Sequence, residues 1–303
     1  MRQRTIKECV ILDGIGLHSG KKTCVHLKPL PANQGIRFKL PGEPSIKLSP
    51  KKVVETILCT SVDLGGTYLK TIEHLLSVLN VLFIDNILID LKDGLEIPIL
   101  DGSSKLIFDK VKKVGIIKQP FFKKAFRVTK KITVNKGDAQ VSLSPVEEKV
   151  SSTFSFMIDF SKRGLTRQYY SFDLNENNYY QQIASSRTFG FAADKPALAR
   201  KGLALGANTS NCLVLDHNGN ALNENGVFYA DECVKHKILD AIGDLYVIGN
   251  RIIGHYEANK ASHALNNELL LAAIEQGALQ KILFPSVSSR SSLKMMSTNP
   301  ATT

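Results

Sequence analysis

Residues 232–248 place one histidine and two carboxylates on the same side of a predicted helix. His236, Asp240 and Asp244 follow one another at intervals of four residues, and side chains four residues apart share a helix face. Apolar neighbours such as Ile238 and Leu239 indicate that this face is partly buried, where an unpaired charge is costly. An imidazole nitrogen and a carboxylate oxygen at this spacing are suitable ligands for one divalent metal ion. A surface ion pair would leave the same pattern, so this segment alone leaves both interpretations open.

A further candidate ligand lies in the first half of the chain. Glu73 and His74 stand near the start of another predicted helix, and we interpret Thr71 as its N-cap. If the two halves pack through related faces, His74 joins His236 and Asp240. Three protein ligands leave the fourth position of a tetrahedral zinc site open, as in catalytic sites. Glu73 would then be placed to take a proton from water; the alternative is a carboxylate that merely favours the first turn of a helix.

His263 follows a predicted strand and its loop, a position where active-site groups often lie. A protonated His263 could donate to a leaving amine, and Asp244 could keep it protonated. The alternative is a histidine at a helix start without a chemical role. The other histidines belong to no comparable group of residues: His18, His26, His217 and His255.

The elements that must position these residues follow one order in both halves of the chain. Each half opens with a predicted hairpin that stops at a proline, Pro29 in the first half and Pro145 in the second. A helix, a strand and a second helix follow in each half. Their predicted ranges are 71–76 onward, 87–91 and 103–114 in the first half, and 232–248, 251–257 and 263–276 in the second. Asp101 follows His74 by the same 27 residues that separate His263 from His236.

This repetition predicts an α+β fold built from two similar, duplicated domains, each a sheet with helices. We place the first domain at residues 1–120, the second at residues 121–285, and a disordered tail rich in Ser and Thr at residues 286–303. The second domain carries an insert at about residues 162–211, rich in aromatic residues, of the kind that forms lids or binding passages. Chance repetition of a generic α+β order is the alternative.

Composition narrows the class of protein. The chain has 39 Lys and Arg against 28 Asp and Glu, a net charge of +11, which favours an anionic partner such as nucleic acid or a phosphorylated small molecule. The basic residues are dispersed and form no recognisable nucleic-acid module. The five cysteines are scattered and contain no C-x-x-C pair, which argues against a disulfide framework or a thiolate zinc site. Any metal ligands are therefore expected among His and acidic residues.

No part of the sequence predicts a membrane anchor or an export signal. No apolar run reaches the roughly 18 residues that cross a bilayer, and the charged residues at the start of the chain lack a following apolar stretch. We expect a cytoplasmic protein, and a monomer.

Several segments together resemble one known family. They are GIGLHSG at residues 14–20, TIEHLL at 71–76, IPILDGS at 97–103, SRTFGF at 186–191, VKHKILDAIGDL at 234–245 and HALNN at 263–267. In this order they are similar to the UDP-3-O-acyl-N-acetylglucosamine deacetylases of lipid A biosynthesis, and the resemblance spans residues 2–275. It implies two similar α+β domains whose helices are sandwiched between outer sheets. It also implies hydrolysis of the substrate's N-acetyl group to acetate and a free amine.

The resemblance further implies a role for each residue of the site. One zinc ion would be bound by His74, His236 and Asp240. The catalytic residues would be Glu73 as general base, His263 as acid, Asp244 as its support, and Thr188 as a donor to the oxyanion. Substrate would be bound by Lys237 near the site, by His18 in the cleft, and by Phe189, Phe191, Leu203 and Gly206 along an acyl-chain passage in the insert. The diphosphate of such a substrate suits the net charge of +11.

Two departures from the family pattern and two rival functions stay open. Ser262 stands where the family usually has Gly, so the local backbone is left open. Ala207-Asn208 stands where Gly-Ser is expected, which leaves the preferred acyl length open. A zinc phosphohydrolase or peptidase could use the same ligands. The metal that the site holds in the cell, zinc or iron(II), is also left open. A basic nucleic-acid-binding protein with an incidental His/Asp cluster is the non-enzymatic alternative; its binding would be indifferent to metal chelation.

Overall fold

The computed structural model describes residues 1–147 and 151–284, so the predicted tail at residues 286–303 lies outside the described part of the chain. Over the described residues the fold is α+β, as predicted, with six α-helices and several mixed sheets. The helices are α1 (Glu73–Val81), α2 (Lys105–Val114), α3 (Glu176–Asn178), α4 (Lys195–Arg200), α5 (Glu232–Leu245) and α6 (His263–Glu275).

Two five-stranded sheets share one topology. Across each sheet, from one edge strand to the other, the first two pairs of neighbouring strands are antiparallel, the third pair is parallel and the fourth is antiparallel. The first sheet has the order β2 (Val10–Ile15), β3 (Lys22–Pro29), β9 (Ile87–Asp93), β4 (Ile36–Lys39) and β5 (Ile46–Lys47). The second has the order β12 (Ile132–Lys136), β13 (Ala139–Ser144), β19 (His255–Asn259), β14 (Thr153–Phe160) and β15 (Leu165–Asp173). Both predicted hairpins are confirmed as β2–β3 and β12–β13.

The remaining strands form smaller sheets. Strand β1 (Arg2–Ile6) pairs with β10 (Ile116–Phe122), and β11 (Lys124–Val128) lies between β18 (Ile252–Ile253) and β20 (Leu279–Leu283). A three-stranded sheet contains β6 (Val53–Glu55), β7 (Ser61–Asp63) and β8 (Tyr68–Leu69), and β16 (Phe189–Phe191) pairs with β17 (Leu213–Leu215).

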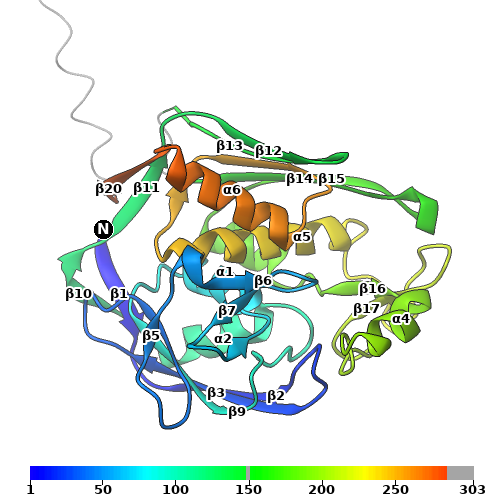
Figure 1. Ribbon diagram of the computed structural model, residues 1–303, viewed down its shortest axis with the longest axis horizontal. Helices are drawn as coiled ribbons and strands as arrows, with labels where there is room; N and C mark the ends of the chain where they lie inside the picture. Colours follow the sequence, from blue (N-terminus) through cyan, green and yellow to red (C-terminus); the bar gives the residue numbers. More distant parts are fainter. Residues whose placement is uncertain (148–150, 285–303) are drawn as a thin grey trace, which may run out of the picture.

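Helices α1, α2, α5 and α6 lie between the two five-stranded sheets (Figure 1). Alternating residues of the strands point toward these helices; in β3, for example, Val25 and Leu27 are fully buried. Every residue of α1 is buried, and so is every residue of α5 except Lys237, whereas α2 and α6 bury one face each. A helix that is apolar nearly all round belongs in the interior, so any polar side chain on α1 or α5 must find its partners inside the protein.

Helices α1 and α5 approach each other closely enough to bring their backbones into contact. A Cβ atom added at Gly243 of α5 would lie 2.0 Å from the carbonyl oxygen of Glu73 on α1. Only glycine permits this approach, which sets the distance between the polar residues of the two helices.

Replacing Gly243 by alanine is expected to lower the free energy of unfolding by about 1–3 kcal/mol, the usual cost of overpacking, because a backbone carbonyl cannot move aside as a side chain can. Urea denaturation would measure the loss. Gly190→Ala is the matched control, since a Cβ atom there meets nothing within 4 Å. Equal stability of the two variants would contradict this account of the helix contact.

Three local predictions differ from the structure. Thr71 is not the N-cap of α1: the cap is Ile72, and Thr71 has a positive φ of 60° while its hydroxyl donates to Glu96 Oε1 at 3.0 Å. The strand predicted at 251–257 is divided into β18 and β19 at Gly254. Part of the stretch predicted as an insert, at 162–211, forms β15, the edge strand of the second sheet.

Within the described part of the chain, no helix is long and apolar enough to cross a membrane.

Candidate metal centre and active site

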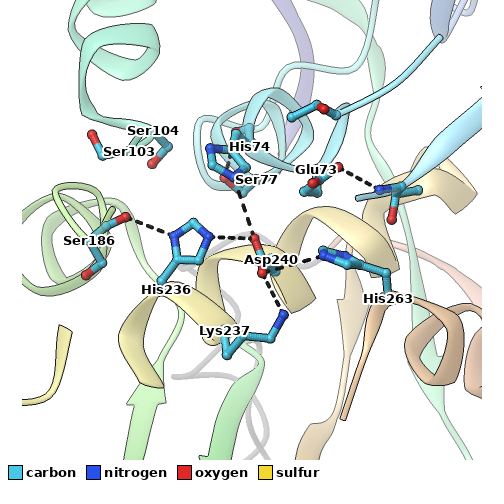
Figure 2. Close-up of polar contacts among 12 residues, drawn as sticks. Glu73, His74, Ser77, Ser103, Ser104, Ser186, His236, Lys237, Asp240 and His263 are labelled. Atoms are coloured by element: carbon cyan, nitrogen blue, oxygen red, sulfur yellow. Dashed lines mark hydrogen bonds and ion pairs between the residues drawn. The ribbon is translucent and has the colours of Figure 1, made fainter. Parts of the chain in front are cut away.

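The candidate ligands from the two halves of the chain meet between α1 and α5. His74 Nε2 lies 3.7 Å from Asp240 Oδ1, and His236 Nε2 lies 3.3 Å from the same oxygen. Figure 2 shows both imidazoles directed at this carboxylate. All three side chains are buried, and their ligand atoms lie within 4.8 Å of one another. The meeting of His74 with His236 and Asp240, predicted from the sequence, is therefore present in the structure.

The protonation states of this cluster suit a metal ion. Burial lowers the pKa of His74 to about 3, and His236 acts in the same direction. Burial also lowers the pKa of His236. Burial alone would raise the pKa of Asp240, but His236 and the Lys237 ammonium hold it below its usual range. Two neutral imidazoles and one carboxylate are a typical donor set for zinc.

Among the three candidate ligands, one buried carboxylate oxygen has no hydrogen-bond partner. Asp240 Oδ2 accepts a hydrogen bond from Lys237 Nζ at 2.8 Å, whereas Oδ1 has none. The Nδ1 atom of His236 is bonded to the carbonyl of Ser186 at 3.0 Å, so its Nε2 atom is the one that faces Asp240. A backbone carbonyl in this position fixes the imidazole tautomer, as partners of ligating histidines do. The residues therefore fit a bound metal ion at Asp240 Oδ1.

A buried polar chain supports the first-half ligand. Ser77 donates to the carbonyl of His74 at 2.8 Å and pairs with the Tyr179 hydroxyl at 2.6 Å. That hydroxyl also pairs with Ser104 at 2.7 Å. Tyr179 comes from the second half, so it links α1 to the loop before α2. The sequence gives no sign of this chain of contacts, because a lone Ser or Tyr in an apolar stretch carries no recognisable pattern.

Glu73 lies at the edge of the cluster, and one of its carboxylate oxygens is within 4.8 Å of ligand atoms of Asp240 and His263. Its Oε2 atom accepts a hydrogen bond from the backbone N–H of Thr60 at 3.0 Å. Burial raises the pKa of Glu73 to about 8, against the opposing influence of His263. A carboxylate with a pKa close to neutral is suited to accept and release a proton at physiological pH.

His263 is held by Asp244, as predicted from the sequence. Its Nδ1 atom lies 2.9 Å from Asp244 Oδ2. The same carboxylate accepts from the Thr60 hydroxyl at 2.6 Å and from the Asn266 amide at 2.8 Å. Burial alone would lower the pKa of His263, but the charge of Asp244 raises it to about 9. Thr60 therefore contacts both Glu73 and Asp244, a role that the sequence analysis missed; Asn266 stands in the quoted HALNN segment.

This pair gives a prediction for the pH dependence of activity. If protonated His263 is required, kcat/KM should fall above about pH 9, where His263 loses its proton. Asp244→Asn removes the charge that raises this pKa, so the alkaline limb of the profile should move to lower pH by about 1–3 units, as expected for loss of a close opposite charge. The profile would be measured at constant metal concentration. Asp109→Asn, on the solvent-facing side of α2, is the control, and an unchanged limb in Asp244→Asn would contradict the assignment.

An apolar cavity of about 450 Å³ lies near this cluster. Four residues predicted to contact substrate line it: His18, Thr188, Phe189 and Phe191. The Phe189 ring meets the ring of the candidate ligand His236 edge-on, with centroids 6.3 Å apart, so one wall of the cavity contacts the candidate metal cluster. Leu203 is buried beside it, and Gly206 packs against the backbone of Gly16; neither is among the lining residues. Lys237 does not line the cavity either; its ammonium group pairs with the Asp240 carboxylate.

His18 is fixed by contacts from both halves. Its backbone N–H donates to Glu96 Oε1 at 2.8 Å, and its Nδ1 atom accepts from the backbone N–H of Ala204 at 3.3 Å. Burial lowers the pKa of His18, so the imidazole that faces the cavity is neutral near pH 7. Glu96 also holds Thr71, two residues before Glu73.

Comparison with known proteins agrees with this geometry. The family model described as LpxC, UDP-3-O-acyl N-acetylglycosamine deacetylase, matches residues 3–275. A protein of Acidithiobacillus ferrooxidans named UDP-3-O-acyl-N-acetylglucosamine deacetylase is 43% identical over 278 residues, which cover 90% of this chain and 90% of that protein. The matched residues include every member of the buried cluster. This chain belongs to the UDP-3-O-acyl N-acetylglycosamine deacetylase family.

Proposed function

We propose that this chain hydrolyses the N-acetyl group of UDP-3-O-acyl-N-acetylglucosamine, releasing acetate and the free amine, an early committed step of lipid A biosynthesis. Membership of the family supports this function. The observation that carries it is the buried cluster of His74, His236 and Asp240 beside an apolar cavity. Such a cavity suits the acyl chain of the substrate, while the polar cluster suits the amide.

The metal ion in this proposal is one zinc ion, held by His74, His236 and Asp240. The two imidazoles, the carboxylate and the unpartnered Asp240 Oδ1 atom support it. Bound zinc would supply Lewis-acid chemistry, which lowers the pKa of water from 15.7 to about 7 and stabilises developing negative charge.

The remaining steps belong to side chains of this protein. Glu73 takes a proton from the water that attacks the acetamide carbonyl, and the Thr60 N–H orients its carboxylate. The Thr188 hydroxyl, which lines the cavity, donates to the oxyanion. His263 gives its proton to the departing nitrogen while Asp244 keeps its imidazole in place, and acetate leaves with the former water oxygen. Proton transfer by positioned groups of this kind contributes about 10²–10⁴-fold to rate.

The substrate is held by residues on both sides of the cluster. Lys237, beside Asp240, contacts the polar part of the substrate, and His18 faces it across the cleft. Phe189, Phe191, Leu203 and Gly206 form or support the acyl passage. We further propose that the chain works as a cytoplasmic monomer.

We also propose that the two halves descend from one duplicated unit. The common topology of the two five-stranded sheets supports this origin. The proposed domains remain residues 1–120 and 121–285. The change of strand partners between β10, which pairs with β1, and β11, which pairs with β20, supports a boundary here.

Acetate release from the UDP-linked acylated sugar tests the function. The expected result is acetate formed in step with free amine, with activity lost on chelation and restored by zinc. Release of phosphate or of a nucleoside monophosphate without acetate would instead identify a phosphohydrolase. Nucleic-acid binding that persists after chelation, without acetate release, would contradict the proposed function.

A further inference from the structure

Exposed aliphatic side chains surround the cavity on its outer side. Ile57, Leu58 and Leu205 are 59%, 51% and 51% exposed. Leu58 also lines the cavity. Leu205 donates its backbone N–H to the carbonyl of His18 at 3.1 Å, so it lies next to another lining residue. Leu58 and Leu205 therefore lie at the cavity from different halves of the chain, and Ile57 precedes Leu58 in the sequence.

Exposed basic side chains lie on the segments next to the cavity: the turn after β2 and the end of α4, whose Lys195 and Leu198 line the cavity. A Cβ atom added at Gly20 would lie 3.3 Å from Leu205 Cβ, which places the exposed Lys21 beside that leucine. Arg200 and Lys201, at the end of α4, are exposed as well. Figure 1 places α4 and the turn between β2 and β3 at the same end of the molecule. We define the mouth patch as Ile57, Leu58, Leu205, Lys21, Arg200 and Lys201.

The composition of α4 fits this arrangement. Between its charged ends, Pro196, Ala197 and Ala199 are exposed and offer only small apolar side chains to solvent. Asp194, the one acidic residue in residues 192–205, forms an ion pair with Arg163 at 2.8 Å. The charge that the segment presents is therefore positive.

We propose that the mouth patch docks on the surface of an anionic lipid bilayer, so that the acyl chain of the substrate passes from the bilayer into the cavity. Surfaces that combine exposed aliphatic side chains with Lys and Arg bind at the boundary between headgroups and acyl chains, and anionic lipids attract basic residues within a Debye length. The net charge of +11 acts in the same direction. The second clause of the proposal rests on the proposed function, because it needs a substrate with an acyl chain; the docking itself does not.

Co-sedimentation of the full-length protein with vesicles tests the docking. Phosphatidylcholine vesicles with phosphatidylglycerol should bind the protein, and vesicles of phosphatidylcholine alone should bind it much less. The double variant Arg200→Glu/Lys201→Glu should have an affinity for the anionic vesicles that is lower by at least about tenfold. Leu205→Ser should also lower this affinity. Added salt should reduce binding of the wild type.

The opposite end of the molecule provides matched controls. Lys124 and Lys281 are exposed on the neighbouring strands β11 and β20, and Leu283 is 62% exposed beside them. The control variants are Lys124→Glu/Lys281→Glu and Leu283→Ser. They change the charge and the apolar surface as much as the mouth-patch variants do, but on strands that lie away from α4 (Figure 1). These variants should bind anionic vesicles like the wild type. Equal losses at both ends would overturn the proposal, because general charge would then explain the binding.

A second measurement separates docking from catalysis. Acetate release from a substrate with a short, water-soluble acyl chain needs no vesicle, and Arg200→Glu/Lys201→Glu should retain it. If the protein releases acetate but never binds anionic vesicles, the docking is wrong and the proposed function stands. If it binds vesicles through the mouth patch without releasing acetate, the proposed function fails alone. A wild-type dimer that Leu205→Ser converts to a monomer, without vesicle binding, would overturn the docking and assign the patch to a second copy of this chain.

Discussion

Replacing Glu73 by alanine is expected to lower kcat for acetate release at least about a hundredfold, the lower end of what general acid–base catalysis contributes, while the metal content stays unchanged. Glu73 lies beside Asp240 and His263 but is not among the three proposed ligands. Its loss should therefore leave the metal in place. The comparison needs kcat and zinc content measured on the same preparation.

The design separates a proton acceptor from a structural carboxylate. Glu73→Gln keeps the shape of the side chain and an oxygen that can accept from the Thr60 N–H, yet it cannot take up a proton in the same way. It should therefore be nearly as inactive as the alanine variant. Glu268→Ala, on the partly exposed surface of α6, is the control and should be fully active. A Glu73→Gln variant close to wild type would show that the carboxylate does not act as the base.

The surroundings shift the pKa values of two histidines of this site in opposite directions. Burial brings the pKa of His74 down to about 3, whereas the contact with Asp244 raises that of His263 to about 9. Near pH 7 the His74 imidazole is therefore neutral and the His263 imidazole is charged, as the proposed roles of ligand and proton donor require. Two groups with pKa values driven apart by their surroundings are what an acid–base mechanism at neutral pH requires.

The sequence predicted the parts of the site that depend on local geometry. The interval of four residues between His236 and Asp240 is enough to place both on one face of α5, because helix periodicity is a local property. The start of α6 at His263 is also confirmed. The approach of His74 was predicted from the repeated order of elements and from the family resemblance, and not from local periodicity. The backbone contact at Gly243 that makes it possible depends on tertiary packing.

Contacts between distant segments were not predictable in the same way. Thr60 reaches Asp244 across 184 residues of sequence, and no pattern around Thr60 distinguishes it from other threonines. Thr71 was assigned as a helix cap because Thr is common at that position, but Glu96 binds its hydroxyl and its φ is positive. At Gly254 a Cβ atom would lie 2.5 Å from Val128 Cγ2. At this residue the chain also changes partners, from β11 for β18 to β13 and β14 for β19, and a strand pattern alone does not show such a change.

Removal of one ligand should have the largest effect on the protein as a whole. We expect His74→Ala to lose more than about a hundredfold in zinc affinity, because even partners that only support a ligand cost 10–100-fold. Acetate release should fall with the metal content. Chelation of the wild type should abolish acetate release to the same extent. Added zinc should restore acetate release in the wild type but not in His74→Ala.

Thermal unfolding gives an independent measure of the same site. A ligand that binds only the folded state stabilises it in proportion to the logarithm of its concentration, so zinc should raise the Tm of chelator-treated wild type and leave that of His74→Ala nearly unchanged. His217→Ala, which removes an exposed histidine from a surface loop, is the matched control and should respond like the wild type. If His74→Ala bound zinc with wild-type affinity and showed the same rise in Tm, residue 74 would not be a ligand. The contact between α1 and α5 would then position Glu73 without completing a metal site.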